Sequence, residues 1–267
     1  MKIPLFQVDV FADRLFGGNP AAVCPLEQWL PDATLQAIGA ENNLPETAFF
    51  VREAHADSDF HLRWFTPTVE VDLCGHATLA SGWVLLERLG WTAPRVRFRT
   101  RSGVLSVERS GEALWLDLPS RPPAPLASPP VGLMRGLRTM PLHWLVAGTN
   151  YFAVYGSEAE ITALAPDFAA LATLVGKGVV VTAPASRAGI DFVSRFFAPG
   201  IGIPEDPATG AAHCLLVPYW AARLGRARLE AVQLSARVGR LQCELAGERV
   251  RLSGPVAPYL RGEIELP

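Results

Sequence analysis

Polar residues that could do chemistry gather in two short segments, each lying just before an apolar run. Residues 71–78 contain Cys74 and His76, and residues 204–212 contain Asp206. If each apolar run is a helix, its first backbone N–H groups are unpaired and lie at the positive end of the helix dipole, which suits a carboxylate or an oxyanion. The local patterns leave alternatives open, because Asp206 followed by proline is also a common helix start and His76 could cap or pack.

A third candidate is Glu46, which follows Pro45 and precedes the apolar run of residues 48–51. A carboxyl group at the start of a strand can act as a general base or acid if it is buried, although glutamates in this position are also often solvated. The segment of residues 17–20, which contains Asn19, is typical of a turn. Taken singly, these segments assign no function.

The chain repeats itself in three blocks. Residues 59–67 recur 132 positions later, residues 75–90 recur 135 positions later, and residues 103–119 recur 136 positions later. Three blocks in the same order indicate a duplication. The two polar segments are therefore equivalent positions, and Cys74 of the first half corresponds to Thr209 of the second.

The repeat predicts two lobes, residues 1–121 and 122–267, with the extreme C-terminus able to pack back on the first lobe. The proline-rich stretch at residues 119–130 separates them, because it can continue neither a helix nor a central strand. Each half reads as strands, one long helix and further strands.

The two long helices are expected over residues 77–89 and 212–224, where the sequence is apolar nearly all round and is followed by glycine. Pro218 should kink the second helix, and a hairpin is expected around Ser110-Gly111. A helix with apolar residues on all sides must be enclosed. We therefore predict an α+β fold of two pseudo-symmetric lobes, each a curved, mostly antiparallel sheet wrapped around a central buried helix.

The composition excludes several classes of protein. The chain has 267 residues, a net charge of −2, 49% apolar residues and 19% charged residues, so it should bury a large core and is neither disordered nor a polycation for nucleic acid. Its four cysteines form no CxxC pair, which argues against a zinc site and a disulfide framework. With no signal peptide and no long apolar span, we expect a cytoplasmic protein without membrane or nucleic-acid partners.

In their order and spacing, these segments resemble the PhzF-like (phenazine biosynthesis-like) family of the diaminopimelate epimerase and proline racemase superfamily. The resemblance covers the whole chain. It implies a diaminopimelate epimerase-like fold with the active site in the cleft between the lobes, a homodimer, and chemistry without a cofactor or a metal. The matching segments are Val8-Asp9-Val10-Phe11, Gly18-Asn19-Pro20-Ala21-Ala22-Val23, Asn43-Leu44-Pro45-Glu46-Thr47-Ala48-Phe49, Arg63-Trp64-Phe65-Thr66-Pro67, Cys74-Gly75-His76-Ala77-Thr78-Leu79-Ala80 and Glu205-Asp206-Pro207-Ala208-Thr209-Gly210.

The resemblance implies that Glu46 is the general base and then the general acid, assisted by His76 and Asp206. The implied reaction removes a carbon-bound proton from a small carboxylate and returns it at another position or face, which gives isomerisation or epimerisation. A carboxylate held at helix ends also helps to bear developing negative charge. The positions that the resemblance places at the substrate are Asn19, Cys74, Gly75, Thr209, Gly210 and Ala211. Many relatives have serine where this chain has Ala211, so one hydroxyl contact is missing.

Two alternatives to this function remain. The first is a one-thiol racemase in which Cys74, its pKa lowered at a helix N-terminus, works against Asp206 or Glu46. A racemase with two cysteines is disfavoured, because Cys74 corresponds to Thr209, and Cys74 can also be a small buried residue. The second alternative is a non-catalytic protein that binds a small carboxylate on the same fold. His213, one turn into the second long helix, could face the cleft or pack.

Overall fold

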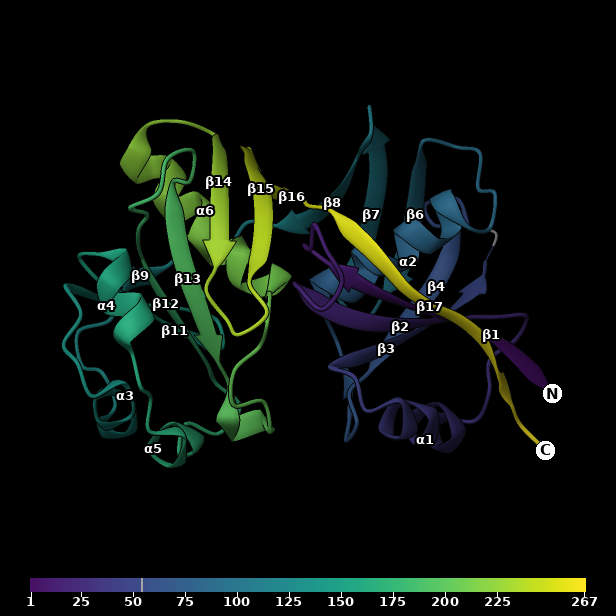
Figure 1. Ribbon diagram of the computed structural model, residues 1–267, viewed down its shortest axis with the longest axis horizontal. Coiled ribbons are helices and arrows are strands. Elements are labelled where there is room, and N and C mark those ends of the chain that lie inside the picture. Colours follow the sequence, from purple (N-terminus) through teal and green to yellow (C-terminus); the bar gives the residue numbers. More distant parts are fainter. Residues whose placement is uncertain (54) are drawn as a thin grey trace. The chain divides into compact units, whose positions relative to one another are not determined.

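The computed structural model describes residues 1–53 and 55–267. These residues form two compact units, an N-terminal unit of Met1–Leu118 with Arg251–Pro267 and a C-terminal unit of Pro119–Val250. Each unit combines a mixed sheet with a long central helix, as Figure 1 shows. The α+β class predicted from the sequence is confirmed.

The N-terminal unit is built on a sheet with parallel and antiparallel pairs. Its strands are β1 (Lys2–Val10), β2 (Asn19–Leu26), β3 (Glu46–Arg52), β4 (Phe60–Phe65), β5 (Glu70–Val71), β6 (Arg95–Thr100), β7 (Gly103–Ser110), β8 (Ala113–Pro119) and β17 (Val256–Glu265), and its helices are α1 (Asp32–Asn42) and α2 (Gly75–Glu87). The final strand, β17, pairs antiparallel with β1. Strands β7 and β8 form the hairpin that the sequence predicted around Ser110-Gly111.

Helix α2 is enclosed by this sheet. Eleven of its 13 residues are buried, and it contacts β1, β2, β3 and β7, so the sheet must curve around it. A Cβ added at Gly82 would lie 2.5 Å from Cβ of Val107 on β7, which explains why glycine is needed at this close approach. The helix begins two residues before the predicted start, because the buried Gly75 and His76 already form its first turn.

The C-terminal unit repeats the arrangement of the first. Its strands are β9 (Ala124–Pro125), β10 (His143–Ala147), β11 (Asn150–Val154), β12 (Gly178–Pro184), β13 (Phe192–Phe197), β14 (Arg228–Gln233) and β15 (Gly239–Ala246). Its helices are α3 (Val131–Leu137), α4 (Glu158–Ala163), α5 (Phe168–Ala172), a 3₁₀ turn (Pro199–Ile201) and α6 (Gly210–Leu224). Strand β16 (Arg249–Ser253) leads out of the unit.

The strand pairs of the two units follow one pattern. From β10 to β15 the pairs alternate antiparallel, parallel, antiparallel, parallel, antiparallel. The same alternation runs from β1 to β7 through β2, β3, β4 and β6, which confirms the predicted pseudo-symmetry.

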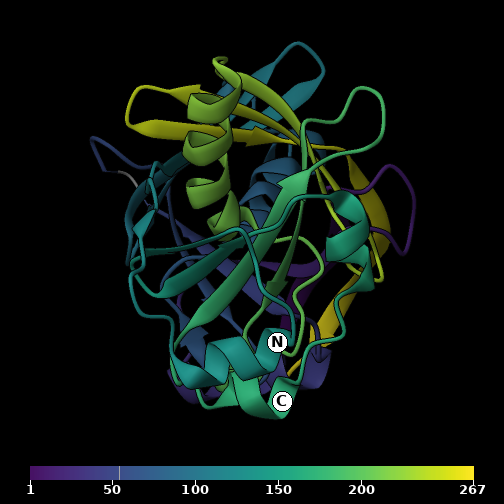
Figure 2. The ribbon, with the colours of Figure 1, turned by 90° about the vertical axis from the view of Figure 1, so that its left-hand side faces the viewer.

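Helix α6 occupies the central place in this unit, against β14 and β15 (Figure 2). Ten of its 15 residues are buried, and it ends at Gly225, whose φ of 67° is the left-handed conformation expected of a C-terminal glycine. The helix continues through Pro218, where the sequence predicted a kink. The rings of Phe192 and Trp220 stack 5.7 Å apart and join the helix to β13.

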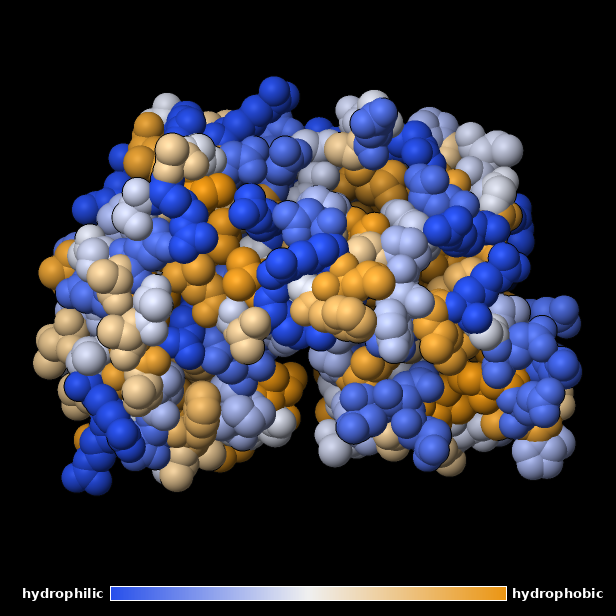
Figure 3. Space-filling view, viewed as in Figure 1, coloured by the Kyte–Doolittle hydropathy of each residue, from blue (hydrophilic) through white to orange (hydrophobic). Residues whose placement is uncertain are grey.

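Hydrophilic and hydrophobic residues are interspersed on the face shown in Figure 3. Among the helices of the described residues, none has both the length and the apolar character that crossing a bilayer requires.

Candidate functional site

The predicted site residues of the first half lie together in the N-terminal unit. Glu46 is the first residue of β3, and Asn19 is the first residue of β2, the strand that runs parallel to β3. Cys74 is the N-cap of α2, and His76 belongs to its first turn. Because α2 packs against β2 and β3, the ends of these three elements bring four polar side chains into one cluster.

His76 is the centre of this cluster. Its Nε2 lies 3.2 Å from Oε2 of Glu46, and its Nδ1 lies 3.2 Å from Nδ2 of Asn19 and 3.5 Å from Sγ of Cys74. With the Asn19 amide donating to Nδ1, the ring proton of a neutral His76 is on Nε2, which faces Glu46. The side chains of His76 and Glu46 are only 4% and 12% exposed, so their interaction is little screened by solvent.

The cluster changes the protonation of its members. Burial opposes the charged form of His76, but the nearby Cys74 and Glu46 favour it and together raise the pKa of His76 well above its usual value. Burial, with the charge of Glu46, raises the pKa of Cys74 to about 11. The lowered pKa that a helix N-terminus led us to expect for Cys74 is therefore wrong, because desolvation outweighs the helix end.

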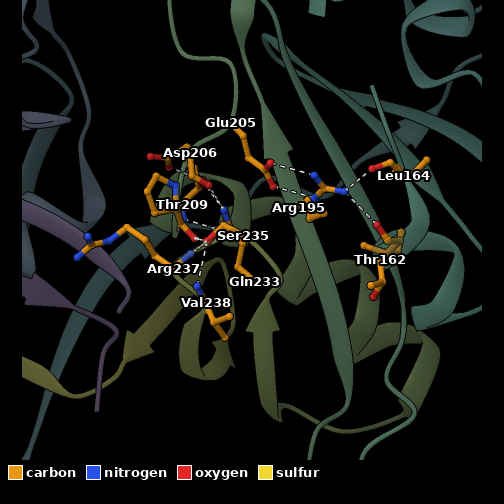
Figure 4. A network of polar contacts seen from close by, with 12 residues as sticks. Thr162, Leu164, Arg195, Glu205, Asp206, Thr209, Gln233, Ser235, Arg237 and Val238 are labelled. Carbon is orange, nitrogen blue, oxygen red and sulfur yellow. Dashed lines mark hydrogen bonds and ion pairs between the residues drawn. The ribbon is translucent and has the colours of Figure 1, made fainter. Parts of the chain in front are cut away.

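The predicted site residues of the second half form a separate hydrogen-bonded network at the start of α6, in the C-terminal unit (Figure 4). The hydroxyl of Thr209, the N-cap, donates to Oδ2 of Asp206. The side chain of Gln233 on β14 binds both residues. Its Nε2 donates to the backbone carbonyl of Asp206 at 2.8 Å, and its Oε1 accepts from the backbone N–H of Thr209 at 2.8 Å. Asp206, Thr209 and Gln233 are all buried, so the Asp206 carboxyl group is held in one orientation.

An ion pair beside Asp206 ties the same loop to the sheet. Arg195 of β13 donates through Nε and Nη2 to both carboxylate oxygens of Glu205, at 2.8 and 2.9 Å (Figure 4). Its Nη1 donates to the backbone carbonyls of Ile161 and Leu164, at 3.2 and 2.8 Å. Bidentate, charge-assisted bonds of this kind fix geometry as well as adding energy.

The same ion pair occurs in the N-terminal unit, where Arg63 donates to both carboxylate oxygens of Glu70 at 2.7 and 2.8 Å. The guanidinium of Arg63 lies 5.1 Å from the ring of Phe65, and that of Arg195 lies 4.9 Å from the ring of Phe197. The duplication has therefore kept this ion pair in the segment before the central helix of each unit.

The sequence left open whether His213 packs or faces a cleft, and the structure shows that it packs. His213 is fully buried, its Nδ1 donates to the backbone carbonyl of Thr209 at 2.8 Å, and its ring lies 6.0 Å from that of Phe192. Burial lowers its pKa to about 4, so it is neutral at pH 7. Thr78 occupies the equivalent position of α2 and donates to the carbonyl of Cys74 at 2.5 Å.

The remaining predicted residues lie at the two helix starts, Gly75 in the first turn of α2 and Gly210 and Ala211 in the first turn of α6. Sequence reasoning missed Gln233, the last residue of β14, which no local pattern distinguishes. It also missed the two ion pairs. Arg195 corresponds to Arg63 and Glu205 to Glu70 at the repeat offsets, and this recurrence could have indicated them.

Comparison with known proteins adds to this geometry. Residues 8–262 match the family model described as phenazine biosynthesis-like protein. An uncharacterized isomerase of Pseudomonas aeruginosa is 54% identical over 266 residues, with 100% of both chains covered. The crystal structure of a PhzF family protein from Enterococcus faecalis superposes with a TM-score of 0.92 at 42% identity, again over 100% of both chains. A hydroxyproline epimerase from Agrobacterium vitis has the same fold, with a TM-score of 0.60 at 11% identity over 98% of this chain and 92% of that one. The family model and these relatives cover nearly the whole chain, and they show that it belongs to the phenazine biosynthesis-like (PhzC-PhzF) family.

Proposed function

We propose that this protein is an isomerase that moves a carbon-bound proton on a small carboxylate, with Glu46 as the group that removes and returns the proton. The observation that carries this proposal is the buried contact between Oε2 of Glu46 and Nε2 of His76, at 3.2 Å. Membership of the PhzC-PhzF family supports it, as does the 54% identity to a protein named as an isomerase.

Glu46 suits the role of base because its carboxylate is poorly satisfied by the protein. Oε2 is buried and, among the described residues, has no well-aligned hydrogen-bond donor, although Nε2 of His76 lies within ion-pair distance. A general base must reach the proton that it removes, and an oxygen without a well-aligned protein donor has a lone pair available for this contact. When Glu46 takes the substrate proton it becomes neutral, and the same proton is then delivered to another carbon or to the other face.

His76 is proposed to hold Glu46 in position and to balance its charge. Asn19 and Cys74 lie on the Nδ1 side of the ring, so rotation of the imidazole would break contacts on both sides. The raised pKa of His76 means that it can share a proton with Glu46 during the reaction.

The first turn of α2 and the first turn of α6 are each proposed as a binding group for a carboxylate, because backbone N–H groups at a helix start favour an anion. Gly75 and Gly210 begin these helices. Asp206 is proposed to assist the proton transfer, and from the family resemblance we also propose a cytoplasmic homodimer that needs no cofactor. Light scattering of the purified protein measures the oligomeric state.

Deuterium exchange tests the proposed chemistry even while the substrate is unidentified. The protein is incubated with a pool of small carboxylic acids in deuterated water, and mass spectrometry detects deuterium bound to carbon. We expect exchange with the wild type and with Glu112→Gln, whose exposed side chain lies in the turn between β7 and β8, but not with Glu46→Gln. Exchange that persists in Glu46→Gln at the wild-type rate refutes the role of Glu46.

The same assay separates the two alternatives. The Cys74 thiol, with a pKa of about 11, is neutral at pH 7 and is a poor base, so Cys74→Ala should retain exchange. Loss of exchange in Cys74→Ala with a folded protein would favour the one-thiol racemase. A carboxylate that binds equally well to wild type and Glu46→Gln without exchange in either would favour a binding protein.

A further inference from the structure

The cluster around His76 contains three different metal-ligand types. Glu46, Cys74 and His76 each offer one ligand atom, and these three atoms all lie within 4.8 Å of one another. A carboxylate oxygen, a thiolate sulfur and an imidazole nitrogen are the ligands that zinc takes in proteins. None of these residues belongs to a CxxC pair, so the sequence carried no metal motif.

Two atoms of the cluster are buried without a well-aligned partner. Oε2 of Glu46 and Nε2 of His76 are inaccessible to solvent and make no hydrogen bond within the described residues, although they lie 3.2 Å apart. Buried polar atoms are nearly always paired. Once Nε2 has lost its proton, a cation beside these two atoms would accept a lone pair from each.

The three ligand atoms, which lie within 4.8 Å of one another, are spaced somewhat more widely than in a zinc site. Zinc bonds of about 2.3 Å to sulfur and about 2.0 Å to nitrogen and oxygen place tetrahedral ligand atoms roughly 3.3–3.6 Å apart. The observed contacts are 3.2 Å from Glu46 to Nε2 and 3.5 Å from Cys74 to Nδ1 of His76. These two contacts use different ring nitrogens, so the side chains must move to bind one ion. Closing the ligand atoms from within 4.8 Å to the spacing of a zinc site takes shifts of about 1 Å.

We propose that Glu46, Cys74 and His76 form an inhibitory site for Zn²⁺. The ion bonds to a Glu46 oxygen, to Sγ of Cys74 and to one nitrogen of His76, and its fourth position is open to solvent or to the substrate carboxylate. The Cys74 thiol proton, and any proton on the ligating nitrogen, is released to solvent, and no electron is transferred. While Zn²⁺ is bound, Glu46 cannot accept a substrate proton.

The binding depends on the three side chains alone, whereas the inhibition rests on the proposed function. Co²⁺ is therefore used first as a spectroscopic probe of binding. We expect a thiolate-to-cobalt charge-transfer band and intense visible bands typical of tetrahedral Co²⁺, both of which disappear on addition of Zn²⁺. Cys74→Ala should lose the charge-transfer band, and Cys243→Ala, which removes another buried thiol far outside the cluster in sequence, should keep it.

Zn²⁺ affinity is then measured by competition with a chromophoric chelator. We expect a wild-type Kd below about 10 µM, a loss of at least about 10-fold in Cys74→Ser and Glu46→Gln, and no change in Cys243→Ala. A weaker wild-type Kd, or an equal affinity in Cys74→Ser, overturns the proposed site.

Deuterium exchange measured with and without Zn²⁺ completes the test. Exchange that Zn²⁺ abolishes in the wild type, and that a chelator restores, supports the inhibitory role. Exchange that continues while Zn²⁺ is bound refutes inhibition and leaves the proposed function intact. Zn²⁺ binding by a protein that exchanges no carboxylate would instead refute the proposed function and leave the site intact.

Discussion

Replacing Glu205 by Gln should destabilise the loop that carries Asp206. The side chain of Arg195 is 13% exposed and that of Glu205 is 21% exposed, and two hydrogen bonds of 2.8 and 2.9 Å join them. A hydrogen bond to a charged group contributes about 1.5–3 kcal/mol. Glutamine keeps one bond, from Arg195 to its amide oxygen, and removes the carboxylate charge that compensates Arg195. We therefore expect a loss of about 2 kcal/mol in the free energy of unfolding.

The matched control is Glu263→Gln, which removes the ion pair between Glu263 and Lys2. The side chain of Glu263 is 54% exposed and that of Lys2 is 63% exposed. Exposed pairs contribute roughly 0–1 kcal/mol, so this variant should unfold nearly as the wild type does. Urea unfolding followed by tryptophan fluorescence gives both values. Amide hydrogen exchange gives a local value, and we expect faster exchange at Asp206, whose N–H donates to the carbonyl of Phe196 at 3.0 Å. Equal losses in the two variants would refute the reasoning.

Three further predictions follow from the buried residues. Folding lowers the pKa of His213 from 6.5 to about 4, so between these pH values the unfolded chain binds more protons, and the free energy of unfolding must fall as the pH drops from 6.5 towards 4. His213→Gln should reduce this fall by up to about 3 kcal/mol. Urea unfolding at several pH values measures it, and an unchanged pH profile would contradict the prediction. Gly82→Ala should destabilise by about 1–2 kcal/mol in spite of the better helix propensity of alanine, because the new Cβ would lie 2.5 Å from Val107, and a raised melting temperature would show that β7 can move away. Glu46→Gln should abolish carbon-bound deuterium exchange while leaving the melting temperature within a few degrees of the wild type.

Local sequence patterns determined the secondary structure and the duplication well. The apolar runs, their terminal glycines and the turn at Ser110-Gly111 act within a few residues, so periodicity predicted α2, α6 and the β7–β8 hairpin. Pro218 lies inside α6 and does not end the helix. The repeat offsets likewise predicted two similar sheets around two similar helices.

The chemistry of the individual side chains was decided only by the tertiary structure. Whether Cys74 is acidic depends on the balance between a helix start, which the sequence shows, and desolvation beside Glu46, which it does not. His213 is a neutral core residue because Phe192, on a strand distant in sequence, packs against it. Gln233 fixes the position of Asp206 because β14 brings its side chain to the Asp206 carbonyl. The sequence by itself determined which residues stand at the two helix starts, since helix boundaries follow from local pattern. Only the packing of α2 against β2 and β3 could bring Glu46, Cys74 and His76 together, because their proximity is a long-range contact and their protonation depends on the water that this contact excludes.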